Sequence, residues 1–196
     1  MHCIVVRWTI VPGEEERVRE LACSMVEPSN AEPGCRAYIL HEDPTDPSAL
    51  FLYEQYDDVA AFDAHCVSPH FRATVEAEIL PRLVEARLEA VETDTPVTVV
   101  PGHATLVRWV AAPGAEADAL AAARRISEAV AADGLFLGHA VHVDPADASV
   151  VLVYEQFADP ADFERHLASA YFAEIVEEGI ASRLVERRRE LLRVIA

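Results

Sequence analysis

The sequence predicts an α+β fold that is built twice in one chain. Three observations lead to this prediction. A stretch that begins Tyr53-Glu54-Gln55 returns as Tyr154-Glu155-Gln156, 101 positions later. In each copy, short runs rich in β-branched and aromatic residues stand beside longer segments with the apolar spacing of helices. The chain of 196 residues is long enough for two small domains.

The first copy has the order β-α-β-β-α-β, the ferredoxin-like split motif. Pro12-Gly13 ends the first strand, Pro28 and Gly34 break the first helix, and Asp43-Pro44 begins a hairpin turn. We expect strands at residues 3–11, 35–42, 50–56 and 87–92, and helices at residues 14–27, 59–66 and 69–79.

The second copy repeats this order after a break in periodicity. Residues 93–102 lack helical spacing and contain two prolines and a glycine, which is typical of a connection. We therefore predict a first ferredoxin-like domain at residues 1–94, a linker at 95–102 and a second ferredoxin-like domain at 103–196. Within the second domain we expect strands at residues 103–111, 135–143, 150–157 and 187–195, and helices at residues 115–132, 160–167 and 171–178.

The strands are apolar on both faces, as in Ile4-Val5-Val6 and Val150-Val151-Leu152-Val153. A four-stranded sheet with helices on one face leaves the other face to be covered. We expect the two sheets to pack against each other and form an intramolecular dimeric α+β barrel, a pseudo-dimer within one chain. This arrangement leaves room for a further homodimer.

Composition excludes several classes of partner. The formal net charge is −18 and every basic residue is an arginine, whereas nucleic acids and anionic membranes require a basic surface. No run of 18 apolar residues and no signal peptide are found, so we expect a cytoplasmic protein. The four cysteines lie in the first copy without a C-x-x-C pair. We interpret them as reduced thiols and predict no metal site.

Both copies contain Tyr-Glu-Gln-x-x-x-x-Ala-x-Phe-x-x-His-x-x-Ser-x-x-Phe or a close variant of it. This pattern resembles the antibiotic biosynthesis monooxygenase (ABM) family, here in a tandem form similar to quinol monooxygenases. Members are usually single domains that dimerise sheet to sheet. The resemblance implies cofactor-free oxygenation of a small aromatic, polyphenol or quinol-like substrate. Other branches degrade haem or process a phosphorylated signal molecule.

The resemblance also implies a pocket between each sheet and its own helices. His65 shares a helix face with Phe62, and His166 shares one with Phe163, by three-residue spacing. An imidazole with an ordinary pKa of about 6.5 is a natural proton acceptor near neutral pH. We therefore predict His65 and His166 as catalytic bases. A structural role at the seam between sheet and helix, or substrate contact without proton transfer, is the alternative for both.

Cofactor-free oxygenation requires the substrate anion, so the pocket needs donors for an oxyanion. Donor candidates for substrate binding are Trp8, Tyr56, His70, Trp109 and Tyr171. Glu54 and Glu155 complete this set, because their strand parity would let each orient a histidine or raise its pKa. The alternatives are that the tryptophans pack in the core and that the glutamates bond a backbone N–H or an arginine.

We expect no cofactor, and a small-molecule substrate and dioxygen as partners. In the haem branch, the resemblance implies a histidine four residues after the motif phenylalanine, where this chain has Val75 and Val176. No Gly-rich phosphate loop indicates a flavin or a nicotinamide. The first copy has more polar groups and is our favoured active site. An isomerase or lyase of a small hydroxy-ketone, or a non-enzymatic binding protein, are the alternatives.

Overall fold

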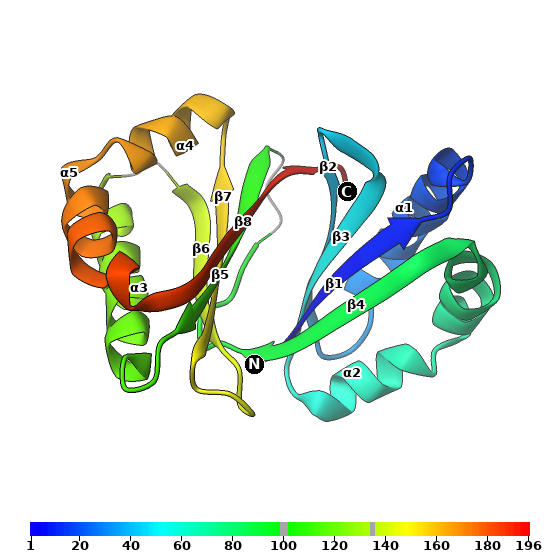
Figure 1. The fold of residues 1–196 in the computed structure, drawn as a ribbon. Coiled ribbons are helices and arrows are strands. Elements are labelled where there is room, and N and C mark those ends of the chain that lie inside the picture. The colour runs from blue at the N-terminus through cyan, green and yellow to red at the C-terminus, as the bar shows by residue number, and fades with distance from the viewer. Residues whose placement is uncertain (99–101, 134–135) are drawn as a thin grey trace. The chain divides into compact units, whose positions relative to one another are not determined.

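The computed structural model describes residues 1–98, 102–133 and 136–196, which form two compact units (Figure 1). The first unit contains Met1–Ala90, a short stretch of the connection from Pro96 onward, and the C-terminal Arg193–Ala196. The second unit contains Val91–Thr95 and the later residues up to Leu192. Each unit therefore includes the end of the last strand of the other repeat and the residues that directly follow it.

The first unit contains a four-stranded antiparallel sheet in the order β4-β1-β3-β2, which is the ferredoxin-like order. Register is defined by pairs such as Ile4 with Glu54 and Tyr38 with Glu54. At the outer edge, His41 of β2 pairs with Val194 at the end of β8. Its elements are β1 (His2–Ile10), α1 (Glu15–Asn30), β2 (Cys35–Asp43), β3 (Asp46–Tyr56), α2 (Val59–Cys66), the π-helical η1 (Phe71–Ile79), the 3-10 turn η2 (Leu80–Arg82) and β4 (Leu83–Glu92).

The second unit repeats this sheet in the order β8-β5-β7-β6. Thr105 and His139 both pair with Glu155 of the central strand β7. At the outer edge, Glu92 at the end of β4 pairs with Val143 of β6. Its elements are β5 (His103–Ala111), α3 (Glu116–Asp133), β6 (Phe136–Val143), β7 (Val150–Phe157), α4 (Pro160–Leu167), α5 (Ala170–Phe172), the π-helical η3 (Ala173–Ile180), the 3-10 turn η4 (Ala181–Arg183) and β8 (Leu184–Val194).

The predicted α+β class with two ferredoxin-like halves is confirmed. The packing of one sheet against the other stays a prediction, and so do the domain limits at residues 94 and 103. Residues 99–101 of the predicted linker lie outside the described residues. Among the residues that the structure describes, no helix is long and apolar enough to cross a membrane.

Helix α1 extends further than the sequence predicts. The sequence predicts an end near residue 27, before Pro28, but the helix runs through Pro28 to Asn30. The reason is the side chain of Asn30, which donates to the carbonyl oxygens of Val26 and Tyr38 at 3.0 and 2.9 Å and accepts from the Tyr38 N–H at 3.0 Å. These bonds tie the last helical turn to β2 and stabilise the turn that follows Pro28.

The short helices that carry the motif histidines begin in the same way. Asp58 accepts a hydrogen bond from the Ala61 N–H, and Asp159 accepts one from the Asp162 N–H. An aspartate at this position stabilises a helix start by about 1 kcal/mol. His65 and His166 therefore lie in the last turns of α2 and α4, directed at the sheet of their own unit.

Replacing Gly34 with alanine should destabilise the first unit by about 2–4 kcal/mol. Its φ of +84° is strained for any residue with a Cβ, and that Cβ would lie 2.8 Å from the Cβ of Ala61 on α2. Gly13 is the matched control, because its φ is +94° but nothing lies within 4 Å of a Cβ there. We expect Gly13→Ala to cost only the backbone strain, about 1–2 kcal/mol. Equal losses for the two variants in urea unfolding would contradict the expected clash with α2.

Candidate functional site

A cavity of about 290 Å³ lies in the second unit, between its sheet and its own helices. Strands β5, β7 and β8 form one side, and helices α3, α4 and α5 form the other. Its walls are mainly apolar, with a few polar groups that converge on the space. The lining residues are Val107, Trp109, Ala123, Ile126, Val153, Glu155, Phe163, His166, Leu167, Phe172, Arg187 and Arg189.

Glu155 is the acidic group of this cavity. One carboxylate oxygen accepts a hydrogen bond from the Thr105 hydroxyl at 2.5 Å. The other lies 3.7 Å from Nε2 of His139 and 3.8 Å from Nε2 of His166. Burial raises the pKa of Glu155 to about 7, and the Thr105 hydrogen bond limits the rise. At neutral pH the carboxyl group can therefore both release and accept a proton.

His166 faces Glu155 across a gap wider than a hydrogen bond. Its Nδ1 lies 2.9 Å from the hydroxyl of Tyr171, and its ring packs edge-on against Phe172 with centroids 4.9 Å apart. Burial lowers the pKa of His166 to about 4, and the charge of Arg189 adds to this effect. The imidazole is therefore neutral at pH 7, with Nε2 directed at the cavity side of Glu155.

Two arginines of β8 give the cavity a cationic side. The Arg189 guanidinium lies over the Phe163 ring at 4.8 Å, and that of Arg187 lies over the Phe172 ring at 5.5 Å. Arg187 also pairs with Glu177 at 2.7 Å. Burial removes part of the hydration of the Arg189 guanidinium, and this lowers its pKa.

Trp109 adds an unused donor. Its indole Nε1 is buried and, among the described residues, has no hydrogen-bond partner. A buried N–H without an acceptor costs about 1–3 kcal/mol, which an oxygen atom of a ligand in the cavity would recover. Trp109 and Arg189 can therefore both receive a ligand oxygen.

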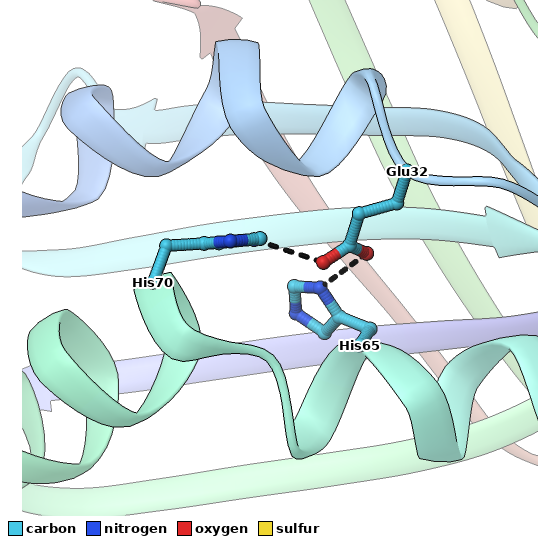
Figure 2. A group of neighbouring side chains, drawn as sticks. All are labelled: Glu32, His65 and His70. Carbon is cyan, nitrogen blue, oxygen red and sulfur yellow. Dashed lines mark hydrogen bonds and ion pairs between the residues drawn. The ribbon is translucent and has the colours of Figure 1, made fainter.

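In the first unit, the motif histidine has a different partner. His65 Nδ1 lies 2.9 Å from Oε2 of Glu32, and His70 Nε2 lies 2.9 Å from Oε1 of the same carboxylate (Figure 2). Ser68 Oγ is 3.3 Å from His70 Nε2, and it also accepts from the Phe71 N–H, so it caps the following helical segment. His65 is fully buried by Tyr38, Tyr56 and Phe71, whose ring centroids lie 5.1–5.7 Å from its own.

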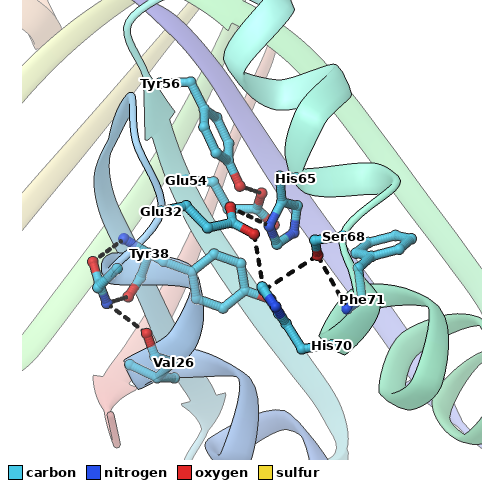
Figure 3. Close-up of polar contacts among 10 residues, drawn as sticks. Val26, Glu32, Tyr38, Glu54, Tyr56, His65, Ser68, His70 and Phe71 are labelled. Atoms are coloured by element: carbon cyan, nitrogen blue, oxygen red, sulfur yellow. Dashed lines mark hydrogen bonds and ion pairs between the residues drawn. The ribbon is translucent and has the colours of Figure 1, made fainter.

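Glu54 is bound within the first unit by its neighbour on β3. The Tyr56 hydroxyl donates to Glu54 Oε2 at 2.8 Å, beside the Glu32 cluster (Figure 3). Burial raises the pKa of Glu54 to about 7 and also raises the pKa of Tyr56. Burial raises the pKa of Cys35 to about 12 and of Cys66 to about 11, so both remain thiols and are poor nucleophiles.

Sequence comparison places the chain among known proteins. The sequence pattern of the family described as antibiotic biosynthesis monooxygenase matches residues 1–77 and again residues 103–178. The chain belongs to this family. It carries the ABM module twice, as the repeated motif predicts, and both modules include the strand, the short helix and the histidine described above.

Relatives of the ABM protein match one module. Rv0793 of Mycobacterium tuberculosis, provisionally named a monooxygenase, is 38% identical over 84 residues, which cover 41% of this chain and 81% of Rv0793. The uncharacterized protein sll1783 of Synechocystis is 32% identical over 89 residues, covering 44% of this chain and 60% of that protein.

Solved structures match the whole ABM chain. One is FN1347 of Fusobacterium nucleatum, also provisionally named a monooxygenase, with a TM-score of 0.87, 14% identity and coverage of 100% of this chain and 92% of that one. Another is an anthrone oxidase-like protein with a TM-score of 0.70, 13% identity and coverage of 100% and 91%. At such identities these likenesses show the fold alone.

The structure separates the predicted site residues of this ABM protein into groups. In the second unit, His166, Glu155 and Trp109 line the cavity, and Tyr171 contacts His166 from behind. In the first unit, His65 and His70 share Glu32, Glu54 pairs with Tyr56, and Trp8 packs in the apolar core beside Ile4 and Leu52. Whether any of these residues is catalytic or binds substrate stays a prediction.

Sequence reasoning missed five residues that shape these sites. They are Glu32, Thr105, His139, Arg187 and Arg189. Comparison of the two copies could have found Arg187 and Arg189, because the first copy has the uncharged Ala86 and Leu88 at the matching positions. A position at which two copies of one module differ in charge, on an element that borders the expected pocket, is a useful marker of a specialised site.

Proposed function

We propose that the second unit is a cofactor-independent monooxygenase of a small phenolic or quinol-like substrate, with dioxygen as the second reactant. The observation that carries the proposal is the cavity in which Glu155, His166, Arg189 and Trp109 face one space. Family membership and the name of the relative Rv0793 support the reaction class. The cytoplasmic location stays a prediction.

The size of the cavity supports a small substrate. An apolar cavity of about 150 Å³ can hold one benzene molecule. A cavity of about 290 Å³ therefore has room for about two fused rings. Its apolar walls suit the faces of such rings, and the polar groups lie where a ring hydroxyl or carbonyl can reach them.

We propose that Glu155 accepts the proton of the substrate, and that the motif histidine His166 assists it. A phenol with a pKa of about 10 exceeds the pKa of about 7 at Glu155 by about 3 units, or roughly 4 kcal/mol. The difference between the pKa of the phenol and that of His166, which is about 4, is about twice as large. We assign His166 to orient the substrate hydroxyl through Nε2, beside the Glu155 oxygen 3.8 Å away, so that Glu155 accepts the proton directly.

The cationic side would stabilise the substrate anion. Arg189 and the Trp109 N–H can both meet an oxyanion, which lowers the cost of deprotonation. The anion can then transfer an electron to dioxygen and bond to it at a ring carbon. In the overall reaction, the ring C–H of the phenol, which is a CH₂ group in its keto tautomer, becomes C=O and the phenol O–H becomes a second C=O. One oxygen atom of dioxygen enters the product, and the other leaves as water with the two hydrogen atoms. The substrate supplies all the electrons.

Dioxygen consumption with acidic naphthols, anthrones and quinols tests the proposal. We expect uptake of one dioxygen per product with one or more of these compounds, and no turnover under anaerobic conditions. Turnover without dioxygen would favour the isomerase or lyase alternative. Absence of both turnover and binding across the panel would contradict the proposal.

Arg189→Leu, which copies Leu88 of the first unit, should raise KM for the anionic substrate about 10- to 100-fold. A hydrogen bond to a charged group contributes about 1.5–3 kcal/mol, and the variant removes it. Arg188→Leu is the matched control, because Arg188 lies outside the cavity lining and pairs with Glu190 at 3.4 Å. Equal KM values for the two variants would remove Arg189 from the proposed site.

A further inference from the structure

Three side chains that commonly bind metal ions converge in the first unit, apart from the cavity of the second. Glu32 comes from the turn between α1 and β2, His65 from the last turn of α2, and His70 from the start of the next helical segment (Figure 2). The ligating atoms of these residues all lie within 4.8 Å of one another. Because the three residues come from separate elements, their spacing along the chain does not have the pattern of a metal-binding motif.

We propose that Glu32, His65 and His70 form a binding site for a divalent transition-metal ion of the Zn²⁺ class. Two imidazoles and one carboxylate with a remaining open position are a ligand set that such ions take in proteins. This site is independent of the proposed oxygenase, which uses side chains of the second unit.

The distances between the ligands suit an ion of this size. Zinc lies about 2.0–2.2 Å from nitrogen and oxygen ligands, so tetrahedral ligands are about 3.3 Å apart. Both histidine nitrogens now lie 2.9 Å from the oxygens of Glu32. Binding therefore requires each histidine–glutamate contact to lengthen by a few tenths of an ångström, and the three ligating atoms, which now lie within 4.8 Å of one another, to close around the ion. The ion would take the place of the proton held between His65 Nδ1 and Glu32 Oε2.

The surroundings provide both support and access. The side chain of His65 is only 1% exposed, which fixes one ligand among aromatic rings, whereas that of His70 is 27% exposed and that of Glu32 is 15% exposed. An ion can reach the cluster from the His70 side, where Ser68 Oγ lies 3.3 Å from Nε2. The formal net charge of −18 also favours cations near the protein.

The second unit has the same short helix and motif histidine, but a different residue at the position of the third ligand. Tyr171 stands at the position that corresponds to His70, and its hydroxyl lies 2.9 Å from Nδ1 of His166. A tyrosine at this position is therefore compatible with the fold and with a hydrogen bond to the motif histidine. His70→Tyr is a conservative variant that removes one ligand and substitutes a contact already present in the protein.

Titration of tag-free, chelator-treated full chain with Zn²⁺ and with Co²⁺ tests the site. We expect one equivalent to bind, visible as heat for Zn²⁺ and as a visible absorption band for Co²⁺, with a higher Tm in the presence of zinc. His70→Tyr and Glu32→Gln should each weaken binding at least 100-fold, while His2→Gln in the same unit should leave the affinity unchanged. Circular dichroism checks that each variant is folded.

Two results would overturn the proposal. One is a wild-type protein that binds less than one equivalent at micromolar Zn²⁺ or Co²⁺. The other is a folded His70→Tyr variant with wild-type affinity, which would place the bound ion elsewhere. Neither result affects the proposed oxygenase, because dioxygen consumption is measured separately.

Discussion

Glu155→Gln should lower kcat/KM for dioxygen-dependent turnover by about 10²- to 10⁴-fold, the usual contribution of a general base. Glutamine keeps the shape of glutamate and can still accept from the Thr105 hydroxyl, so the cavity should persist. It cannot accept the proton of the substrate. The loss should therefore lie mainly in kcat, with a small change in KM.

The pH profile separates a base from a merely structural side chain. Since Glu155 must be ionised to accept a proton and its pKa is about 7, wild-type kcat/KM should rise with pH through about 7 and then level off. This rise should be absent in Glu155→Gln. Steady-state dioxygen uptake between pH 5.5 and 8.5 measures both effects.

Glu128→Gln is the matched control for this prediction. It makes the same chemical change on the exposed side of α3, away from the cavity lining. We expect wild-type kinetics from it. A Glu155→Gln enzyme with wild-type rate and an unchanged pH profile would show that Glu155 is not the proton acceptor. Activity that survives in Glu155→Gln but disappears in His65→Ala would instead assign the reaction to the first unit.

The fold was predictable because its signals are local. Apolar periodicity and the Asp-Pro hairpin act over a few residues, and the repeat presents both of them twice. Pro28 shows the limit of this reasoning. The side chain of Asn30 keeps the helix intact by bonding to Tyr38 of β2. That contact depends on how the helix packs on the sheet, which the local pattern does not contain.

The sites were predictable in part for the same reason. His166 and Glu155 belong to the repeated motif, so their approach follows from strand parity and helix spacing. Arg189 does not, because Arg187-Arg188-Arg189 has the pattern of a solvated strand edge. Only packing shows that Arg189 lies over Phe163. Glu32 is 33 positions before His65, in a turn with proline and glycine, so nothing local connects the two residues.

Unfolding free energy should fall as pH drops from 7 to 5, because buried imidazoles resist protonation. Burial lowers the pKa of each of five histidines in the native state, from an ordinary value of 6.5 to about 4 for four of them. The four are His41, His139, His142 and His166, and the fifth is His65, whose pKa is also lowered by burial. As pH falls below 6.5, the unfolded chain takes up protons that the folded chain refuses, and stability is lost.

Two buried carboxyl groups act in the opposite direction. Burial raises the pKa of Glu54 and Glu155 from 4.5 to about 7, so the folded chain holds protons that the unfolded chain releases. Their contribution grows as pH falls from about 7 toward 4.5. Because the histidines outnumber these carboxyl groups, the unfolded chain should still bind more protons between pH 6 and 5. Each net proton changes the unfolding free energy by about 1.4 kcal/mol per pH unit.

Urea unfolding at several pH values measures this slope in each unit. Trp8 and Trp109 are the two tryptophans of the chain, one in each core, so Trp8→Phe and Trp109→Phe backgrounds report the units separately. His142→Gln should reduce the slope of the second unit by about one proton, because His142 is fully buried and bonds the Leu152 carbonyl at 3.1 Å. Stability that stays constant or increases between pH 7 and 5 would mean that these imidazoles accept protons without leaving their buried positions.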